Sequence, residues 1–361
     1  MNKKHNRSLP EKFTQRLTEM FGVSLCQQIQ QTFVERPTTF RVNTIKADKN
    51  EIRQNLFDLG FKTDNVVWYK DAFILKNKSL RELQELDLYK QGKIYVQSLA
   101  SMVPPLVLNP QAGEVVLDLT AAPGSKTSQI VALMSKIGEL VANDVDKVRF
   151  EKLRHNMELL GILSEVKDLS EGINNEIQNL NIVQLKATST DPTGTSCPPP
   201  LIGEELGWRF VLKNENGVEL SKLYPNYFDK ILLDAPCTAE ARIILDKPAT
   251  YGFWQERNIK DTAYVQRKLL FSAWQMLKPG GILVYSTCTF APEENELQIT
   301  KFMEQNTNCE LLPIELNGVN KLTIVKSWKD RDINKEVIKK ALRIMPSKEI
   351  EGFFVVKLKK D

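Results

Sequence analysis

The sequence has only two histidines, His5 and His155, and five cysteines among its 361 residues. A Ser-His-Asp or Cys-His mechanism needs a histidine beside its nucleophile, so such chemistry is poorly supplied here. The cysteines are odd in number and widely spaced, without a CxxC pair, which predicts neither a disulfide framework nor a zinc site. We therefore expect no bound metal, and any functional cysteine should be a free thiol.

Long apolar runs are missing as well. No stretch of about 18 uninterrupted apolar residues occurs, and the polar start of the chain leads into no apolar signal segment. These features predict a cytoplasmic protein that makes no membrane contact.

Positive charge is concentrated in the first third of the chain. Residues 1–110 hold 17 Lys and Arg against 11 Asp and Glu, a net +6, whereas the remainder is −2 and the whole chain +4. This distribution favours RNA contact by the N-terminal region. Arg36 and Arg41 flank a short β-rich segment that we expect at an exposed sheet edge, contacting the RNA backbone. The competing hypothesis is that these arginines brace a domain interface.

One stretch has the pattern of a strand, a tight turn and a helix. The strand spans 115–119, the turn 121–124 is built of small residues, and helical spacing begins at Thr127. Such a turn presents backbone N–H groups and a helix N-terminus to an anionic ligand. Gly124 is the only glycine in it, which excludes both a dinucleotide fingerprint and a Walker A loop.

A carboxylate suited to a ribose follows the next predicted strand. Asp144 comes twenty residues after Gly124, at the end of the strand 138–144. A ribose site paired with a carboxylate site indicates S-adenosylmethionine, although an ordinary α/β turn with a solvated aspartate is the alternative. The predicted contacts along the turn are Thr120, Ala121, Ala122, Pro123, Gly124, Ser125 and Lys126.

Two further predicted strands end in cysteine motifs. The strand 228–234 leads into Asp234-Ala-Pro-Cys237, and the strand 282–286 leads into Thr287-Cys288. Because the carboxyl ends of parallel strands meet at one sheet edge, both thiols should lie beside the cofactor turn. The other cysteines are expected to be small buried hydrophobes; they are Cys26, Cys197 and Cys309.

These blocks together resemble the Nop/Sun (RsmB-type) family of S-adenosylmethionine-dependent RNA cytosine-5 methyltransferases. The resemblance extends from about Arg36 to the C-terminus, excluding the 163–225 region. It implies an α/β fold, with a Rossmann-like class I methyltransferase sheet and a small N-terminal α+β RNA-binding domain. The expected division is 1–105 for the RNA-binding region and 106–361 for the catalytic domain, with an inserted segment at about 163–225.

The resemblance also implies roles for particular residues. Cys288 would be the nucleophile, Cys237 would assist product release, and Asp234 would contact the target base while also bordering the cofactor. A thiolate that adds to carbon 6 of cytosine makes carbon 5 able to attack a sulfonium methyl group. The adenine would be contacted by Asp191, with Thr188 as the alternative.

The chain departs from the family pattern at three places, one of which is the absence of a clear Asp after the third strand, where the family usually contacts the adenine. Thr120 stands where a cysteine is frequent, and Ala241 follows Glu240 where a glycine is common. We also expect a third strand at 182–187, followed later by a hairpin whose strands at 208–212 and 218–220 flank 214–217.

The expected substrate is rRNA or tRNA, and the expected state is a monomer. Two other hypotheses stay open at this point. One is a non-catalytic RNA-binding or ribosome-assembly factor on a methyltransferase fold. The other is a DNA or small-molecule cytosine methyltransferase in which Cys237, which follows Pro236, exchanges roles with Cys288.

Overall fold

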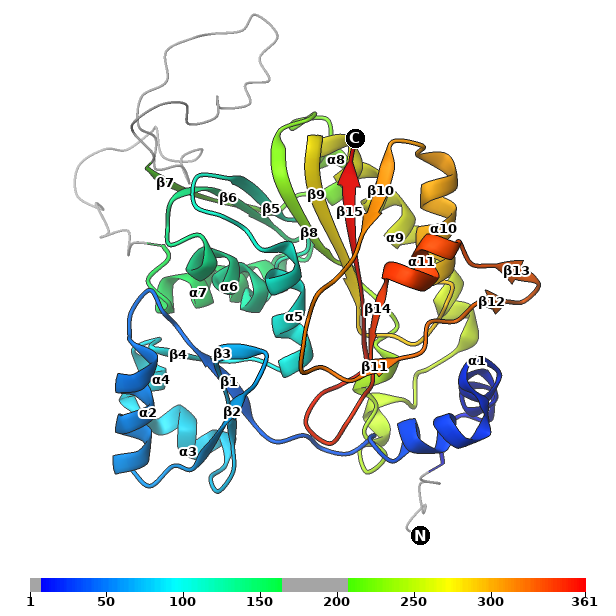
Figure 1. The fold of residues 1–361 in the computed structure, drawn as a ribbon. Coiled ribbons are helices and arrows are strands. Elements are labelled where there is room, and N and C mark those ends of the chain that lie inside the picture. Colours follow the sequence, from blue (N-terminus) through cyan, green and yellow to red (C-terminus); the bar gives the residue numbers. More distant parts are fainter. Residues whose placement is uncertain (1–7, 164–206) are drawn as a thin grey trace, which may run out of the picture.

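A mixed sheet of nine strands forms the larger part of the molecule in a computed structural model, which describes residues 8–163 and 207–361. The order is β11-β14-β15-β9-β8-β5-β6-β7, with β10 beside β15 (Figure 1). The parallel strands are β5 (Val115–Asp118), β6 (Gly138–Asn143), β7 (Trp208–Lys213), β8 (Phe228–Asp234) and β9 (Leu277–Thr287). The antiparallel ones are β10 (Cys309–Leu312), β11 (Lys321–Leu322), β14 (Leu342–Ile344) and β15 (Phe353–Lys360).

Helices cover both faces of this sheet (Figure 1). Along β5, Val115 and Leu117 pack into the cluster under α8 to α11, whereas Val116 packs into the cluster under α5 to α7. A strand buried on both faces is rich in β-branched and leucine residues, as this one is. The helices are α5 (Leu99–Leu108), α6 (Ser125–Leu133), α7 (Lys147–Leu159), α8 (Gly217–Leu220), α9 (Glu256–Met276), α10 (Glu296–Gln305) and α11 (Lys335–Lys340), with 3₁₀ turns η2 (Glu240–Arg242) and η3 (Pro248–Thr250) and a ribbon of β12 (Ser327–Trp328) and β13 (Arg331–Asp332).

The hairpin expected after residue 207 is wrong. β7 pairs in parallel with β6 and is the outer strand of the described sheet, so the apolar run at 208–212 completes the parallel sheet. The second expected strand is instead the short helix α8, because the Asn216 side chain accepts a hydrogen bond from the Val218 amide and starts a helical turn. The strand expected at 182–187 lies outside the described residues.

A separate antiparallel sheet forms the small N-terminal α+β unit. Its order is β2-β3-β1-β4, so β1 is an interior strand. The exposed edge expected around Arg41 is therefore wrong, and the Arg41 side chain is fully buried. The elements are β1 (Thr39–Val42), β2 (Thr63–Val66), β3 (Tyr69–Leu75), β4 (Ile94–Val96), α2 (Lys49–Asp58), α3 (Leu80–Glu85) and α4 (Asp87–Lys90).

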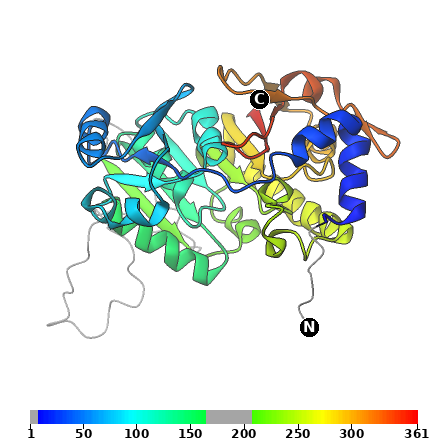
Figure 2. The ribbon, with the colours of Figure 1, turned by 90° about the horizontal axis from the view of Figure 1, so that it is seen from below.

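The first helix lies apart from that small sheet. α1 (Glu11–Gln30) is broken at Gly22, whose φ of 77° is non-helical. Phe13 and Leu17 pack with Tyr251 and Phe290 of the larger part. Figure 2 shows α1 on the opposite side of the view from the small sheet. No helix within 8–163 and 207–361 is long and apolar enough to cross a bilayer.

Buried polar contacts join the small sheet to the larger part. Arg41 donates from Nε to Gln97 at 2.8 Å, and from Nη2 to the Ser125 carbonyl at 3.2 Å and to Ser128 Oγ at 2.5 Å. Gln97 in turn donates to Gln129 at 3.0 Å. The interface-brace hypothesis is thus confirmed for Arg41, which ties β1 to helix α6.

Candidate active site

The turn between β5 and α6 depends on a glycine. Gly124 has a φ of 105°, in the left-handed region that favours glycine. A Cβ there would lie 2.6 Å from Met157 Cε and 2.9 Å from Leu153 Cδ1, both in α7. A side chain here would be strained by the backbone conformation and would displace the ends of Met157 and Leu153, so glycine favours the packing on α7 that brings the N-terminus of α6 to the sheet edge.

Asp144 holds the same turn from the end of β6. Its Oδ2 accepts from the Ala122 amide at 3.1 Å, and its Oδ1 accepts from the Asp146 amide at 3.0 Å. Arg149 Nη1 lies 3.4 Å from Oδ2. Each carboxylate oxygen accepts more than one hydrogen bond, so this arrangement leaves capacity for ribose hydroxyls.

Asp118 is a site residue that the sequence analysis did not single out. Thr127 Oγ1 donates to its Oδ2 at 2.7 Å, while its buried Oδ1 has no hydrogen-bond partner among the described residues. Burial raises the pKa of Asp118 to about 7. The available signal was an acidic residue ending an apolar strand just before a tight turn.

These groups fit S-adenosylmethionine. The unpaired oxygen of Asp118 suits an ammonium group, the first turn of α6 suits a carboxylate, and Asp144 suits a ribose. With β7 as the strand beside β6, Asn214 and Asn216 follow the strand end from which an adenine would be contacted. Asp191 and Thr188 lie outside the described residues.

Lys126 connects the cofactor turn to the base side of the site. Its Nζ lies 2.6 Å from Asp234 Oδ2 and donates to Ser101 Oγ at 2.8 Å. Ser286 Oγ donates to Asp234 Oδ1 at 2.7 Å, and Thr120 Oγ1 donates to the Asp234 carbonyl at 2.9 Å. Lys126 is buried, so it is not a solvated surface charge.

The two cysteines at the strand ends meet. Cys237 Sγ and Cys288 Sγ are 3.3 Å apart, and the Ala241 amide donates to the Cys288 carbonyl at 3.1 Å. Their hydrogen bond, with the positive charge of Arg242, lowers the pKa of Cys288 against the effect of burial. The same hydrogen bond, together with burial, raises the pKa of Cys237.

Arg242 is therefore the cation that helps to lower the pKa of Cys288. Arg242 was not among the site residues expected from the sequence. The remaining described cysteines are free thiols away from this pair, packed in or against apolar clusters; they are Cys26 and Cys309. Within the described ranges no group of His, Cys, Asp and Glu is placed to hold a metal ion.

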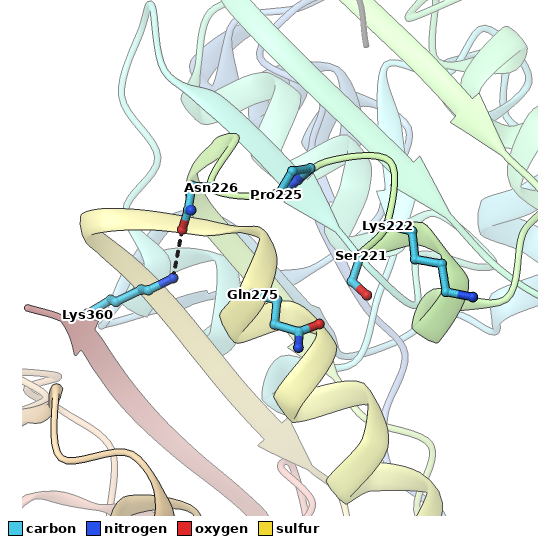
Figure 3. Close-up of a pocket in the computed structure, with 6 residues that line it drawn as sticks. All are labelled: Ser221, Lys222, Pro225, Asn226, Gln275 and Lys360. Atoms are coloured by element: carbon cyan, nitrogen blue, oxygen red, sulfur yellow. Dashed lines mark hydrogen bonds between the residues drawn. The ribbon is translucent and has the colours of Figure 1, made fainter. Parts of the chain in front are cut away.

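A separate hollow of about 450 Å³ lies at the amino end of β8, next to Asn226 (Figure 3). Lys360 Nζ is already held there, by Asn226 Oδ1 at 2.9 Å and by the carbonyls of Trp274 and Leu277, each at 2.8 Å. The full length of β8 separates this hollow from Asp234 and the thiols. We therefore place the candidate active site at the thiol pair and not in this hollow.

Two family models match the chain. The model described as 16S rRNA methyltransferase RsmB/F matches residues 105–178 and 204–359, and the N-terminal domain of 16S rRNA methyltransferase RsmF matches residues 9–99. The chain belongs to the RsmB/F family. Members of the RsmB/F (NOP2/Sun) family are RNA cytosine-5 methyltransferases dependent on S-adenosylmethionine, and this chain is such an enzyme, acting on rRNA or tRNA.

Among curated relatives of this RsmB/F chain is a tRNA (cytosine(49)-C(5))-methyltransferase from Pyrococcus abyssi, 31% identical over 90% of the chain and 88% of the relative. Another is a 26S rRNA (cytosine-C(5))-methyltransferase from Caenorhabditis elegans, 30% identical over 94% of the chain but 44% of the relative. A solved methyltransferase homolog from Pyrococcus horikoshii is 30% identical over 98% of the chain and 96% of that structure, with a TM-score of 0.74.

Proposed function

We propose that this RsmB/F enzyme methylates its cytosine through a covalent bond between Cys288 and carbon 6 of the base. The observation that carries the proposal is the 3.3 Å thiol pair beside Arg242, whose positive charge acts more strongly on Cys288 than on Cys237 and lowers the pKa of Cys288. The thiolate is the reactive form of cysteine, so the lower pKa favours Cys288 as the nucleophile.

The remaining residues have separate tasks in this scheme. Addition of the Cys288 sulfur to carbon 6 leaves carbon 5 electron-rich. The Lys126–Asp234 pair can hold or supply a proton at nitrogen 3 as charge builds on the ring. When bound, S-adenosylmethionine supplies an electrophilic methyl group for carbon 5.

Release requires two bonds to break after methylation, and nitrogen 3 returns to the Lys126–Asp234 pair any proton that it received. The proton on carbon 5 passes to water, and the bond between carbon 6 and sulfur breaks as the ring regains its double bond. The Cys237 S–H then donates a hydrogen bond to the departing Cys288 sulfur. This is the same contact that lowers the pKa of Cys288. The raised pKa of Cys237 keeps the proton available for this step.

Residues at the turn would hold the cofactor. We propose that the amides of Ser125 and Lys126 bind its carboxylate, Asp118 its ammonium group and Asp144 its ribose. The division into residues 1–105 and 106–361, the monomeric state and the cytoplasmic location remain predictions from the sequence.

Trapping on RNA that contains 5-fluorocytosine tests the assignment of the two thiols, because fluorine at carbon 5 blocks release. We expect the parent to form an adduct whose RNA is attached at Cys288, and the Cys288→Ala variant to form none. The Cys237→Ala variant should accumulate an adduct even on unmodified RNA. An adduct mapped to Cys237 would instead exchange the two roles.

A further inference from the structure

Two buried carboxyl groups link the loops that carry the thiols. Glu294, from the loop after β9, binds Thr238 next to Cys237, with Oε2 accepting from the Thr238 amide at 3.1 Å. Glu240, from the loop after β8, binds the residues after Cys288 in return. Its Oε2 accepts from Thr289 Oγ1 at 2.9 Å and from the Phe290 amide at 3.1 Å.

Two threonine hydroxyls connect these carboxyl groups. Glu294 Oε1 lies 2.5 Å from Thr238 Oγ1, which lies 2.8 Å from Thr289 Oγ1, which lies 2.9 Å from Glu240 Oε2. The chain thus has three oxygen-to-oxygen contacts, and each needs one proton to be a hydrogen bond. The two threonines supply one proton each. The third proton must reside on a carboxyl group.

The surroundings place that proton on Glu294. Burial raises the pKa of Glu240, but this carboxyl receives donors on both oxygens, including Trp254 Nε1 at 2.9 Å, and the charge of Arg16 favours its ionised form. Glu294 Oε2 receives the Thr238 amide and Gln266 Nε2, the latter at 2.8 Å, whereas Oε1 faces the Thr238 hydroxyl. The hydrogen bonds therefore run from Glu294 Oε1 through the two threonines to Glu240.

We propose that Glu294 and Glu240 are positioning residues that share one proton through Thr238 and Thr289. The resulting series of three hydrogen bonds sets the spacing of the two thiols. Thr238 follows Cys237 directly and Thr289 follows Cys288 directly, so a change in these hydrogen bonds moves the backbones of both cysteines. The proposal rests on the assignment of Cys288 as the nucleophile, but its first test below needs no RNA.

Loss of the shared proton should separate the loops. Burial raises the pKa of Glu294 to about 8, so above that pH one hydrogen bond disappears and a second buried negative charge forms beside the thiols. Other charged or titratable groups surround the chain; they are Arg16 of α1, Arg242 of η2, Glu256 of α9, Tyr285 of β9, Glu293, Arg343 of β14, Asp234 and the two thiols.

The first test measures thermal unfolding of the full chain between about pH 5 and 9. The folded pKa of Glu294 lies above its ordinary value, so its contribution to stability is full below that value and is lost as pH rises toward 8. The Glu294→Gln variant should lose less stability across this range than the parent. The control, Glu293→Gln, removes a partner of Arg16, and its stability should change with pH as that of the parent does. A parallel curve for Glu294→Gln would overturn the shared proton.

The second test measures methylation against pH. A glutamine N–H can replace the shared proton, so Glu294→Gln should retain turnover and move the alkaline loss of activity to higher pH. Glu294→Leu should lose at least tenfold. If the alkaline loss came from Cys237 instead, the glutamine variant would move it to lower pH, because Glu294 helps to raise that pKa. Equal losses of turnover in Glu294→Gln and Glu294→Leu, with folding intact, would also refute the proposal.

Discussion

Asp144 affects cofactor binding in two ways, as a ribose acceptor and as the group that holds the Ala122 amide. We predict that Asp144→Ala weakens cofactor binding by about 1.5–3 kcal/mol, the usual range for hydrogen bonds to a charged group. Calorimetry of cofactor binding checks this. The matched control is Asp146→Ala, which removes the cap of α7 and should lower stability by about 1 kcal/mol with little effect on cofactor affinity.

Lys126 offers a second test at single residues. Its replacement by methionine keeps the apolar stem but removes the charge that pairs with Asp234. We predict a fall in turnover of roughly 10²–10³-fold, the usual effect of losing one group that stabilises charge in the transition state. The Ser101→Ala variant removes the hydrogen bond from Lys126 to Ser101 but keeps its charge and its pairing with Asp234, and it should change turnover much less. Single-turnover methylation separates the two.

The residues that the sequence analysis named were those whose position in the chain reveals them. Asp234, Cys237 and Cys288 stand at strand ends, where the topology of a parallel sheet brings side chains together. Arg242 and Glu294 escaped notice because they act across loops. Their importance depends on which loop packs against which, and no local pattern contains that information.

At the scale of elements, the alternation and length of apolar runs located most strands, but they did not determine pairing. The run at 208–212 has the same composition whether it forms a hairpin or continues a parallel sheet. Its place beside β6 depends on contacts with residues far away in the chain. Likewise, β1 looked like an edge because Pro37 and polar residues surround it, yet β3 and β4 pair with it on both sides.

The interior position of β1 leads to a prediction for Arg41. We expect Arg41→Ala to destabilise the protein by about 1–3 kcal/mol, the usual cost of an unsatisfied buried group, because Gln97 Oε1 loses its buried donor and Ser128 Oγ loses one of its hydrogen bonds. Denaturant unfolding gives the magnitude. The slope of RNA affinity against salt should stay at the parent value for the protein that remains folded, since a buried guanidinium contacts no phosphate.

At the scale of the molecule, a salt titration of RNA affinity can test whether Arg36 contacts RNA, because Arg36, unlike Arg41, is only partly buried. Its Nη2 donates to the Thr32 carbonyl, and its Nε has no hydrogen-bond partner within the described part of the chain. If it contacts one phosphate, Arg36→Ala should reduce the log–log salt slope by about 0.7–0.9 with a small change in melting temperature. An unchanged slope would leave the basic N-terminal region without this contact.

The Arg41 joint has a consequence for how the two substrates affect each other. Arg41 and Gln97 extend from the N-terminal unit to helix α6, whose first turn faces the cofactor site, so a shift of β1 moves that turn through these side chains. If RNA bound on this sheet shifts β1, it will alter the affinity for S-adenosylmethionine. Thermodynamic reciprocity then requires the cofactor to alter the affinity for RNA by the same factor. The N-terminal unit would then influence cofactor affinity as well as contact RNA.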